Sequence, residues 1–127
     1  MDKNVRLFLK KLKETPNFRR VKFVFYYGSR ISGVATKMSD FDFCIFYEGN
    51  SKERFAFLLK IGTKLPDNFD IHIFQDIPLF VRKEVLKGKL IYCQDEDFVC
   101  DIAKETIKEF DDFKKRYYDY IGLEIMK

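Results

Sequence analysis

Hydrophobic residues recur at helical spacing in four stretches of the chain, which predicts four helices. The predicted helices cover residues 3–14, 51–65, 78–87 and about 95–120. Pro16 ends the first pattern, and Ser51 is the expected N-cap of the second helix. The last helix carries a long apolar stripe, formed by Phe98, Ile102, Ile107, Phe110, Phe113 and Tyr117. Its exposed tyrosines are candidates for a surface that contacts a partner protein.

Short, dense apolar runs separate these helices and predict buried strands. The runs are "VKFVFYY" (21–27), "FDFCIF" (41–46), "FDIHIF" (69–74) and the shorter "LIYC" (90–93). Strands that are joined by helices imply a mixed, partly parallel sheet. The pattern therefore predicts an α+β fold (an α/β mixed sheet), in which helices flank a central sheet within one domain over residues 1–127.

Composition narrows the class of protein. The 127 residues carry a formal net charge of +4, with no run of five like charges, so no direct nucleic-acid binding is expected. Cys44, Cys93 and Cys100 lack CxxC spacing, which favours reduced thiols over disulfides or a zinc site. No stretch of eighteen apolar residues and no leader is present, so we expect a cytoplasmic protein without a membrane segment.

Two aspartates interrupt the second buried strand. Asp40 and Asp42 are two residues apart and share one face, so that Phe41 and Phe43 enter the core behind them. Two buried carboxylates repel each other unless a cation joins them, and oxygen ligands favour Mg²⁺ or Mn²⁺. Asp70, on the next strand, is the expected third ligand and would help to deprotonate an incoming hydroxyl. Two such ions would suit an in-line phosphoryl displacement.

The end of the first strand offers groups that bind phosphate. Gly28 allows a close approach of the backbone, and Ser29 adds a hydroxyl and N–H donors at an expected helix start. Arg30 can add a bidentate contact to a phosphate. The sequence thus predicts phosphate donors opposite the metal-binding carboxylates, which suits a nucleoside triphosphate.

The pattern "GSR..G.A...SDFDF", followed by "FDIHIF" and "IPLFVRKEVLKGKLIYCQD", resembles the polymerase-β-like nucleotidyltransferase superfamily. Within it, the chain is similar to the minimal nucleotidyltransferases, the antitoxins of HEPN/MNT toxin–antitoxin modules, over roughly residues 20–120. The resemblance implies that Asp40, Asp42 and Asp70 bind metal ions and that Gly28 and Ser29 hold the triphosphate. It also implies transfer of AMP from ATP to a tyrosine hydroxyl of a HEPN toxin partner. The family often has a second basic residue where this chain has Ile31 and Ser32.

Other interpretations of the same residues stay open. Asp70 follows Asn68 in a turn and suits a structural cap, His72 is more often structural than catalytic, and Arg30 is equally suited to a surface ion pair. The protein could be a non-catalytic antitoxin that sequesters its partner, or a nucleotidyltransferase acting on small molecules. The sequence decides neither the nucleotide nor whether the chain forms a homo- or hetero-oligomer.

Overall fold

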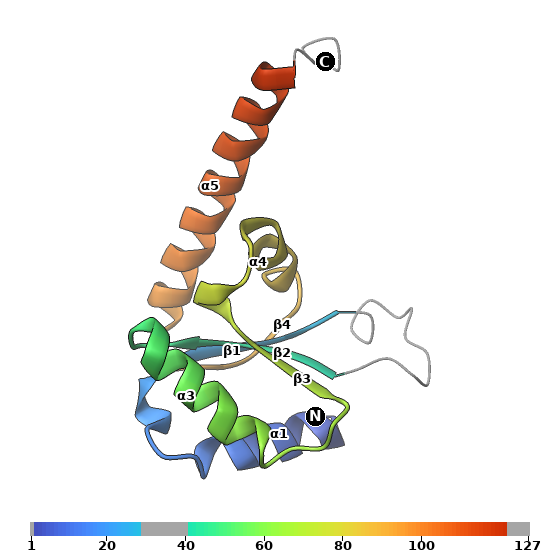
Figure 1. The fold of residues 1–127 in the computed structure, drawn as a ribbon, viewed down its shortest axis with the longest axis vertical. Coiled ribbons are helices and arrows are strands. Elements are labelled where there is room, and N and C mark those ends of the chain that lie inside the picture. The colour runs from blue at the N-terminus through green and yellow to red at the C-terminus, as the bar shows by residue number, and fades with distance from the viewer. Residues whose placement is uncertain (1, 29–40, 122–127) are drawn as a thin grey trace.

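The computed structural model describes residues 2–28 and 41–121 (Figure 1). Within them, four strands form one sheet in the order β3-β2-β1-β4. The strands are β1 (Val21–Tyr27), β2 (Phe41–Tyr47), β3 (Phe69–Ile73) and β4 (Lys89–Cys93). β1 pairs antiparallel with β2 and β4, whereas β2 and β3 are parallel and are joined by a helix. The predicted mixed sheet with flanking helices is therefore confirmed.

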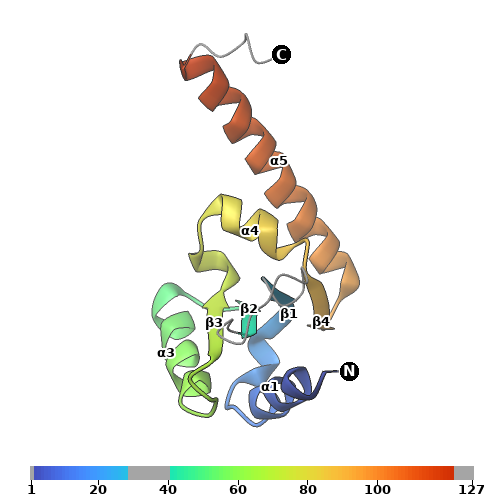
Figure 2. The ribbon, with the colours of Figure 1, turned by 90° about the vertical axis from the view of Figure 1, so that its right-hand side faces the viewer.

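Helices cover both faces of this sheet. The α-helices are α1 (Lys3–Lys13), α3 (Ser51–Gly62), α4 (Leu79–Val85) and α5 (Glu96–Ile121), with short 3-10 helices at η1 (Phe18–Arg20) and η2 (Phe74–Asp76). α1 and α3 lie on one side of the sheet, and α4 and the start of α5 lie on the other (Figure 1). Most of α5 extends away from the sheet, as the turned view shows (Figure 2). No described helix is long and apolar enough to cross a membrane.

The two faces of the sheet form two separate cores. Phe43 of β2 is fully buried on the α1 side and stacks on Phe8, with ring centroids 4.0 Å apart. On the other side, Phe23 and Cys44 are fully buried beside Val99 of α5. Because consecutive strand residues alternate between these cores, the strands are apolar on both faces, as the dense hydrophobic runs predict.

Helix boundaries differ from the sequence prediction where a cap decides them. The N-cap of α3 is Asn50 rather than Ser51: its side chain accepts from the Glu53 N–H, and the Glu53 carboxylate accepts from the Asn50 N–H, both at 2.9 Å. Asn and Ser are comparable N-caps, so the choice depends on this reciprocal capping box. The prediction of Ser51 as N-cap was wrong by one residue.

The apolar stripe of α5 is buried only in part. Phe98 and Ile102 pack against the core, but Ile107, Phe113 and Tyr117 are about half exposed, at 48%, 51% and 50%. The predicted helical period is correct, but α5 extends beyond the sheet, so the sheet cannot cover the second half of its apolar stripe. The described cysteines are free: Cys44 is buried, Cys93 half-buried and Cys100 exposed.

Candidate active site

Three polar side chains lie in a row across one end of the sheet. Tyr27 of β1 is the antiparallel partner of Asp42 of β2, and Asp42 is the parallel partner of Asp70 of β3. Residues that face each other across paired strands lie on the same side of the sheet, with Cβ atoms about 5 Å apart. A tyrosine and two carboxylates from three strands therefore share one surface.

Gly28 brings the backbone against one of these carboxylates. Its φ of +94° lies in the left-handed region, which only glycine adopts at little cost. A Cβ built at Gly28 would collide with Oδ2 of Asp42 and would lie 3.1 Å from its Cγ. The chain thus turns at the end of β1 with its bare backbone directly beside the Asp42 carboxylate.

Gly88 supports this corner from a distant part of the chain. A Cβ at Gly88 would lie 2.5 Å from the carbonyl oxygen of Tyr26 and 2.8 Å from Cβ of Tyr27. The turn between α4 and β4 therefore packs directly on the last residues of β1. Gly88 thus helps to hold Tyr27 and Gly28 in position.

Burial controls the protonation of the groups around Asp42. It raises the pKa of the Tyr27 phenol, and the neighbouring Cys44, Asp42 and Asp70 raise it further. Burial alone raises the pKa of the Cys44 thiol, which lies two residues beyond Asp42 on the same face. At neutral pH Tyr27 is therefore a neutral hydrogen-bond donor beside two carboxylates, and Cys44 is an inert thiol.

His72 contacts the carboxylate of the third strand. Its Nε2 lies 3.0 Å from Oδ2 of Asp70, and both side chains are partly exposed. The two residues alternate with Ile71 and Ile73, which pack into the core on the opposite face, as the period of two predicts. The contact with His72 orients the Asp70 carboxylate, which lies on the same face of the sheet as Asp42.

Several predicted site residues lie outside the described part of the chain. These are Ser29, Arg30 and Asp40, together with the neighbouring Ile31 and Ser32. Within residues 2–28 and 41–121, the His, Cys, Asp and Glu side chains form no group of three or more suited to a metal ion. Asp42 and Asp70 nevertheless fit a hard divalent cation, because two carboxylate oxygens from neighbouring strands are the ligands that Mg²⁺ prefers.

The sequence analysis missed Tyr27 and Gly88 as parts of this site. Tyr27 directly precedes Gly28, so the strand period could have placed it near the glycine turn. The contact of Gly88 with β1 depends on the pairing of β1 with β4, about sixty residues away in the chain, for which no local signal exists.

Comparison with known proteins decides the family. A family model described as "Polymerase beta, Nucleotidyltransferase" matches residues 10–97, more than half of the chain. The chain belongs to this nucleotidyltransferase family. This confirms the predicted family and enzyme class, and it places the glycine turn and the strand with Asp42 inside the matched region.

One relative of this nucleotidyltransferase comes from Methanocaldococcus jannaschii. It is named "Putative protein adenylyltransferase" and is 30% identical over 93 residues, which cover 73% of this chain and 72% of the relative. The similarity thus extends over most of both chains.

Two solved structures share the fold of this nucleotidyltransferase. A chain in the crystal structure of a toxin–antitoxin with AMP-PNP superposes with a TM-score of 0.73 at 17% identity and covers 98% of this chain and 99% of its own. A chain in the structure of a tri-AMPylated Shewanella oneidensis HEPN toxin in complex with an MNT antitoxin gives 0.66 at 16% identity, covering 98% and 97%. At these identities the likeness concerns the fold, and together with the family match it confirms the predicted polymerase-β-like fold.

Replacement of Gly28 by alanine is expected to disturb the site more than the fold. The added methyl group would displace the Asp42 carboxylate and would also strain a residue at φ +94°. We expect nucleotide transfer to fall by about 100-fold or more, since a small misplacement of reacting groups has effects of that size. Transfer is measured with labelled ATP and the co-expressed partner, and folding by circular dichroism.

Gly62→Ala is the matched control for this substitution. Gly62 ends α3, and apart from its chain neighbours and its own helix backbone no atom of the described residues lies within 4 Å of a Cβ placed there. Its alanine variant is expected to keep full activity. If the two variants had equal activity, the close approach of Gly28 to Asp42 would not matter for the reaction.

Proposed function

We propose that this nucleotidyltransferase uses Mg²⁺ and ATP to transfer AMP to a tyrosine hydroxyl of a HEPN-family toxin and thereby acts as its antitoxin. The observation that carries this proposal is the pairing of Asp42 and Asp70 beside the bare turn at Gly28. The name of the archaeal relative, a protein adenylyltransferase, supports the reaction class. The solved complexes with HEPN toxin and with AMP-PNP support the partner and the nucleotide.

The chain supplies distinct groups for each part of the reaction. Asp42 and Asp70, with Asp40 as the third acid, would hold two Mg²⁺ or Mn²⁺ ions, which neutralise the triphosphate and activate the attacking hydroxyl when bound. Asp70, oriented by His72 at 3.0 Å, would accept the proton of the acceptor hydroxyl. The hydroxyl oxygen then forms a bond to the α-phosphorus while the bond to the leaving pyrophosphate breaks.

The phosphates would be held at the end of β1. Gly28 leaves space for the triphosphate next to Asp42, and Ser29 and Arg30 are proposed as further phosphate donors. Tyr27, as a neutral phenol in the same row, adds a hydrogen-bond donor. Of these groups, Tyr27 and Gly28 lie beside Asp42 at one end of the sheet, and Asp42 is paired with Asp70.

A mass measurement tests this function directly. The toxin partner is co-expressed with the wild-type chain, purified and analysed by mass spectrometry for a gain of one or more AMP groups. A modified tyrosine in the partner is the expected result. An unmodified toxin that is nevertheless inactive in the complex would favour sequestration without catalysis. Modification of a small molecule alone would favour a nucleotidyltransferase that acts on small molecules.

An apolar groove between α4 and α5 is the proposed contact surface for the toxin. It is lined by Pro78, Leu79, Phe80, Phe110 and Phe113, with a volume of about 240 Å³. The side chains of Phe80 and Phe113 are 62% and 51% exposed. Large aromatic side chains that are exposed together are typical of protein-contact surfaces. The half-exposed stripe of α5 continues beyond the groove, which suits a helical partner protein. The role of segment 95–120 in partner contact stays a prediction.

A Phe113→Ser variant is expected to weaken toxin binding without loss of folding. Phe113 is half exposed, so its removal costs little in the free protein, whereas an aromatic anchor at an interface typically contributes tenfold or more to affinity. Phe55→Ser is the matched control, because Phe55 is 60% exposed on α3, across the sheet. Calorimetric titration with the purified toxin compares the two. Equal affinity of both variants would place the interface elsewhere.

A further inference from the structure

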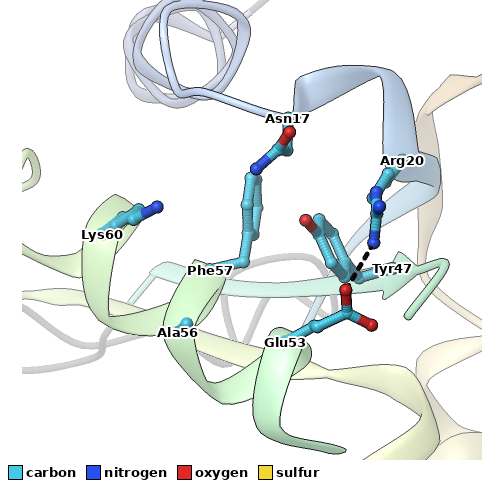
Figure 3. Close-up of a pocket in the computed structure, with 7 residues that line it drawn as sticks. All are labelled: Asn17, Arg20, Tyr47, Glu53, Ala56, Phe57 and Lys60. Atoms are coloured by element: carbon cyan, nitrogen blue, oxygen red, sulfur yellow. Dashed lines mark hydrogen bonds and ion pairs between the residues drawn. The ribbon is translucent and has the colours of Figure 1, made fainter. Parts of the chain in front are cut away.

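A small pocket lies between η1 and α3, with a volume of about 140 Å³ (Figure 3). Its lining consists of Asn17, Arg20, Tyr47, Glu53, Ala56, Phe57 and Lys60. A single water needs only about 10–15 Å³ of such space, so the pocket has room for a small polyatomic ligand. Its polar side chains converge from the turn before β1, from the end of β2 and from α3, whereas Phe57 forms an apolar wall (Figure 3).

The hydroxyl of Tyr47 is the most unusual group in this pocket. Tyr47 is only 3% exposed and its ring stacks on Phe57, with centroids 4.4 Å apart. The hydroxyl points into the pocket, and within the described part of the chain no hydrogen bond to it is found (Figure 3). The hydroxyl lines the pocket, so it can donate a hydrogen bond to a ligand that enters there. Burial raises the pKa of Tyr47, which keeps the phenol a donor.

The charges around the hydroxyl favour an anion. Arg20 donates through Nη1 to Oε2 of Glu53 at 2.9 Å, and this ion pair holds the guanidinium at the rim. Its other N–H groups form no hydrogen bond with any residue in 2–28 or 41–121. Glu53 already accepts on Oε1 from the Asn50 N–H at 2.9 Å, so both its oxygens are occupied. Lys60 faces the pocket and forms no ion pair within the described residues (Figure 3). The pocket therefore has two cationic side chains, Arg20 and Lys60, and one carboxylate, Glu53, which is already hydrogen-bonded.

The pocket is separate from the candidate active site. Tyr47 lies five residues beyond Asp42 on β2, a distance of about 17 Å along a strand. Tyr47 packs into the core on the α1 and α3 side, whereas Asp42 projects from the opposite face. A ligand in this pocket would thus contact none of the groups assigned to nucleotide transfer.

The geometry points to a second ligand site, in which Tyr47, Arg20, Lys60 and Asn17 bind a small phosphate-class oxyanion. A tetrahedral oxyanion offers several acceptors at once, which match a phenol, a guanidinium, an ammonium and an amide as donors. The same chemistry is offered by inorganic phosphate and by the phosphate of a nucleoside monophosphate. The pocket accepts the phosphate, and its small volume favours the free ion over the nucleotide.

Nuclear magnetic resonance titration of the full chain tests the site without ATP or partner, so its outcome is independent of the proposed function. Inorganic phosphate is expected to shift the backbone amides of Arg20, Tyr47 and Lys60 saturably. AMP is expected to bind there more weakly, and acetate at equal ionic strength to produce no saturable shift. Equal binding of acetate, or AMP binding tighter than phosphate at these amides, would overturn the assignment.

Three variants separate a specific site from general charge attraction. Tyr47→Phe removes only the hydroxyl and keeps the stack on Phe57, and Lys60→Gln removes one exposed charge. Each is expected to weaken phosphate binding about tenfold, the usual size for a hydrogen bond to a charged group. Lys52→Gln makes the same charge change on α3 outside the pocket and should leave the affinity unchanged. Equal losses in the two lysine variants, or none in Tyr47→Phe, would contradict the site.

Discussion

An Asp42→Asn substitution is expected to abolish the proposed nucleotide transfer to the toxin while the fold is retained. Asparagine keeps the shape of the side chain and the pairing of β2 with β1 and β3, but it removes the negative charge that faces Gly28 and Asp70. We expect a loss of at least about 100-fold to 1000-fold, the usual effect of removing one charge-stabilising group from an active site. Transfer of labelled AMP to the co-expressed partner measures it.

The control for this experiment is Asp67→Asn. Asp67 is exposed in the turn before β3. Its substitution makes the same chemical change away from the row of Tyr27, Asp42 and Asp70. Undiminished labelling by the Asp42 variant would contradict the catalytic role of the carboxylate. A growth-rescue assay adds a second comparison: a variant that no longer labels the toxin but still neutralises it would show that sequestration suffices.

A Phe43→Ala substitution is expected to lower the free energy of unfolding by about 3–5 kcal/mol, which is the usual cost of emptying a buried phenylalanine site. Phe43 is fully buried and its ring lies 4.0 Å from Phe8, 5.0 Å from Tyr26 and 5.7 Å from Phe69. These neighbours come from three other elements, so they cannot all move in to fill the cavity. Urea denaturation followed by circular dichroism measures the loss.

Phe55→Ala serves as the comparison for stability. Phe55 is 60% exposed, and exposed substitutions usually change the free energy of unfolding by less than about 0.5 kcal/mol. A loss below about 1 kcal/mol at Phe43 would mean that the stacked rings do not form the core as described. Because Phe43 directly follows Asp42, the same substitution should also reduce transfer through disorder of β2.

The sequence predicts those parts of the fold that depend on local periodicity. The dense runs gave the strands, and the alternation within "FDFCIF" correctly separates the face of Asp42 from the face of Phe43. Asp40 and Asp42 are recognisable as candidate site residues because a charged side chain beside or within an apolar strand is costly to bury without a partner. The parallel arrangement of the two strands that carry Asp42 and Asp70 was predicted from the helix between them, which is the usual connection of parallel neighbours.

The remaining features depend on contacts between distant segments. Gly88 packs on Tyr27 because β4 pairs with β1, and no sequence pattern near Gly88 predicts that contact. The stripe of α5 has the correct period, but period alone does not tell where the sheet ends and solvent begins. The pocket around Tyr47 was missed for the same reason, since its donors come from three elements and no motif joins them.

The order of strands in the sheet also determines when the sheet can close during synthesis. β3 ends at residue 73 and β4 at residue 93. After β3 has been made, twenty more residues must therefore be synthesised before β4 can pair with the open edge of β1. At ordinary translation rates of about 5–20 residues per second, this lasts roughly one to four seconds. During that interval the nascent chain presents an unpaired, strongly hydrophobic strand edge, the kind of surface that chaperones bind and that aggregates when left alone.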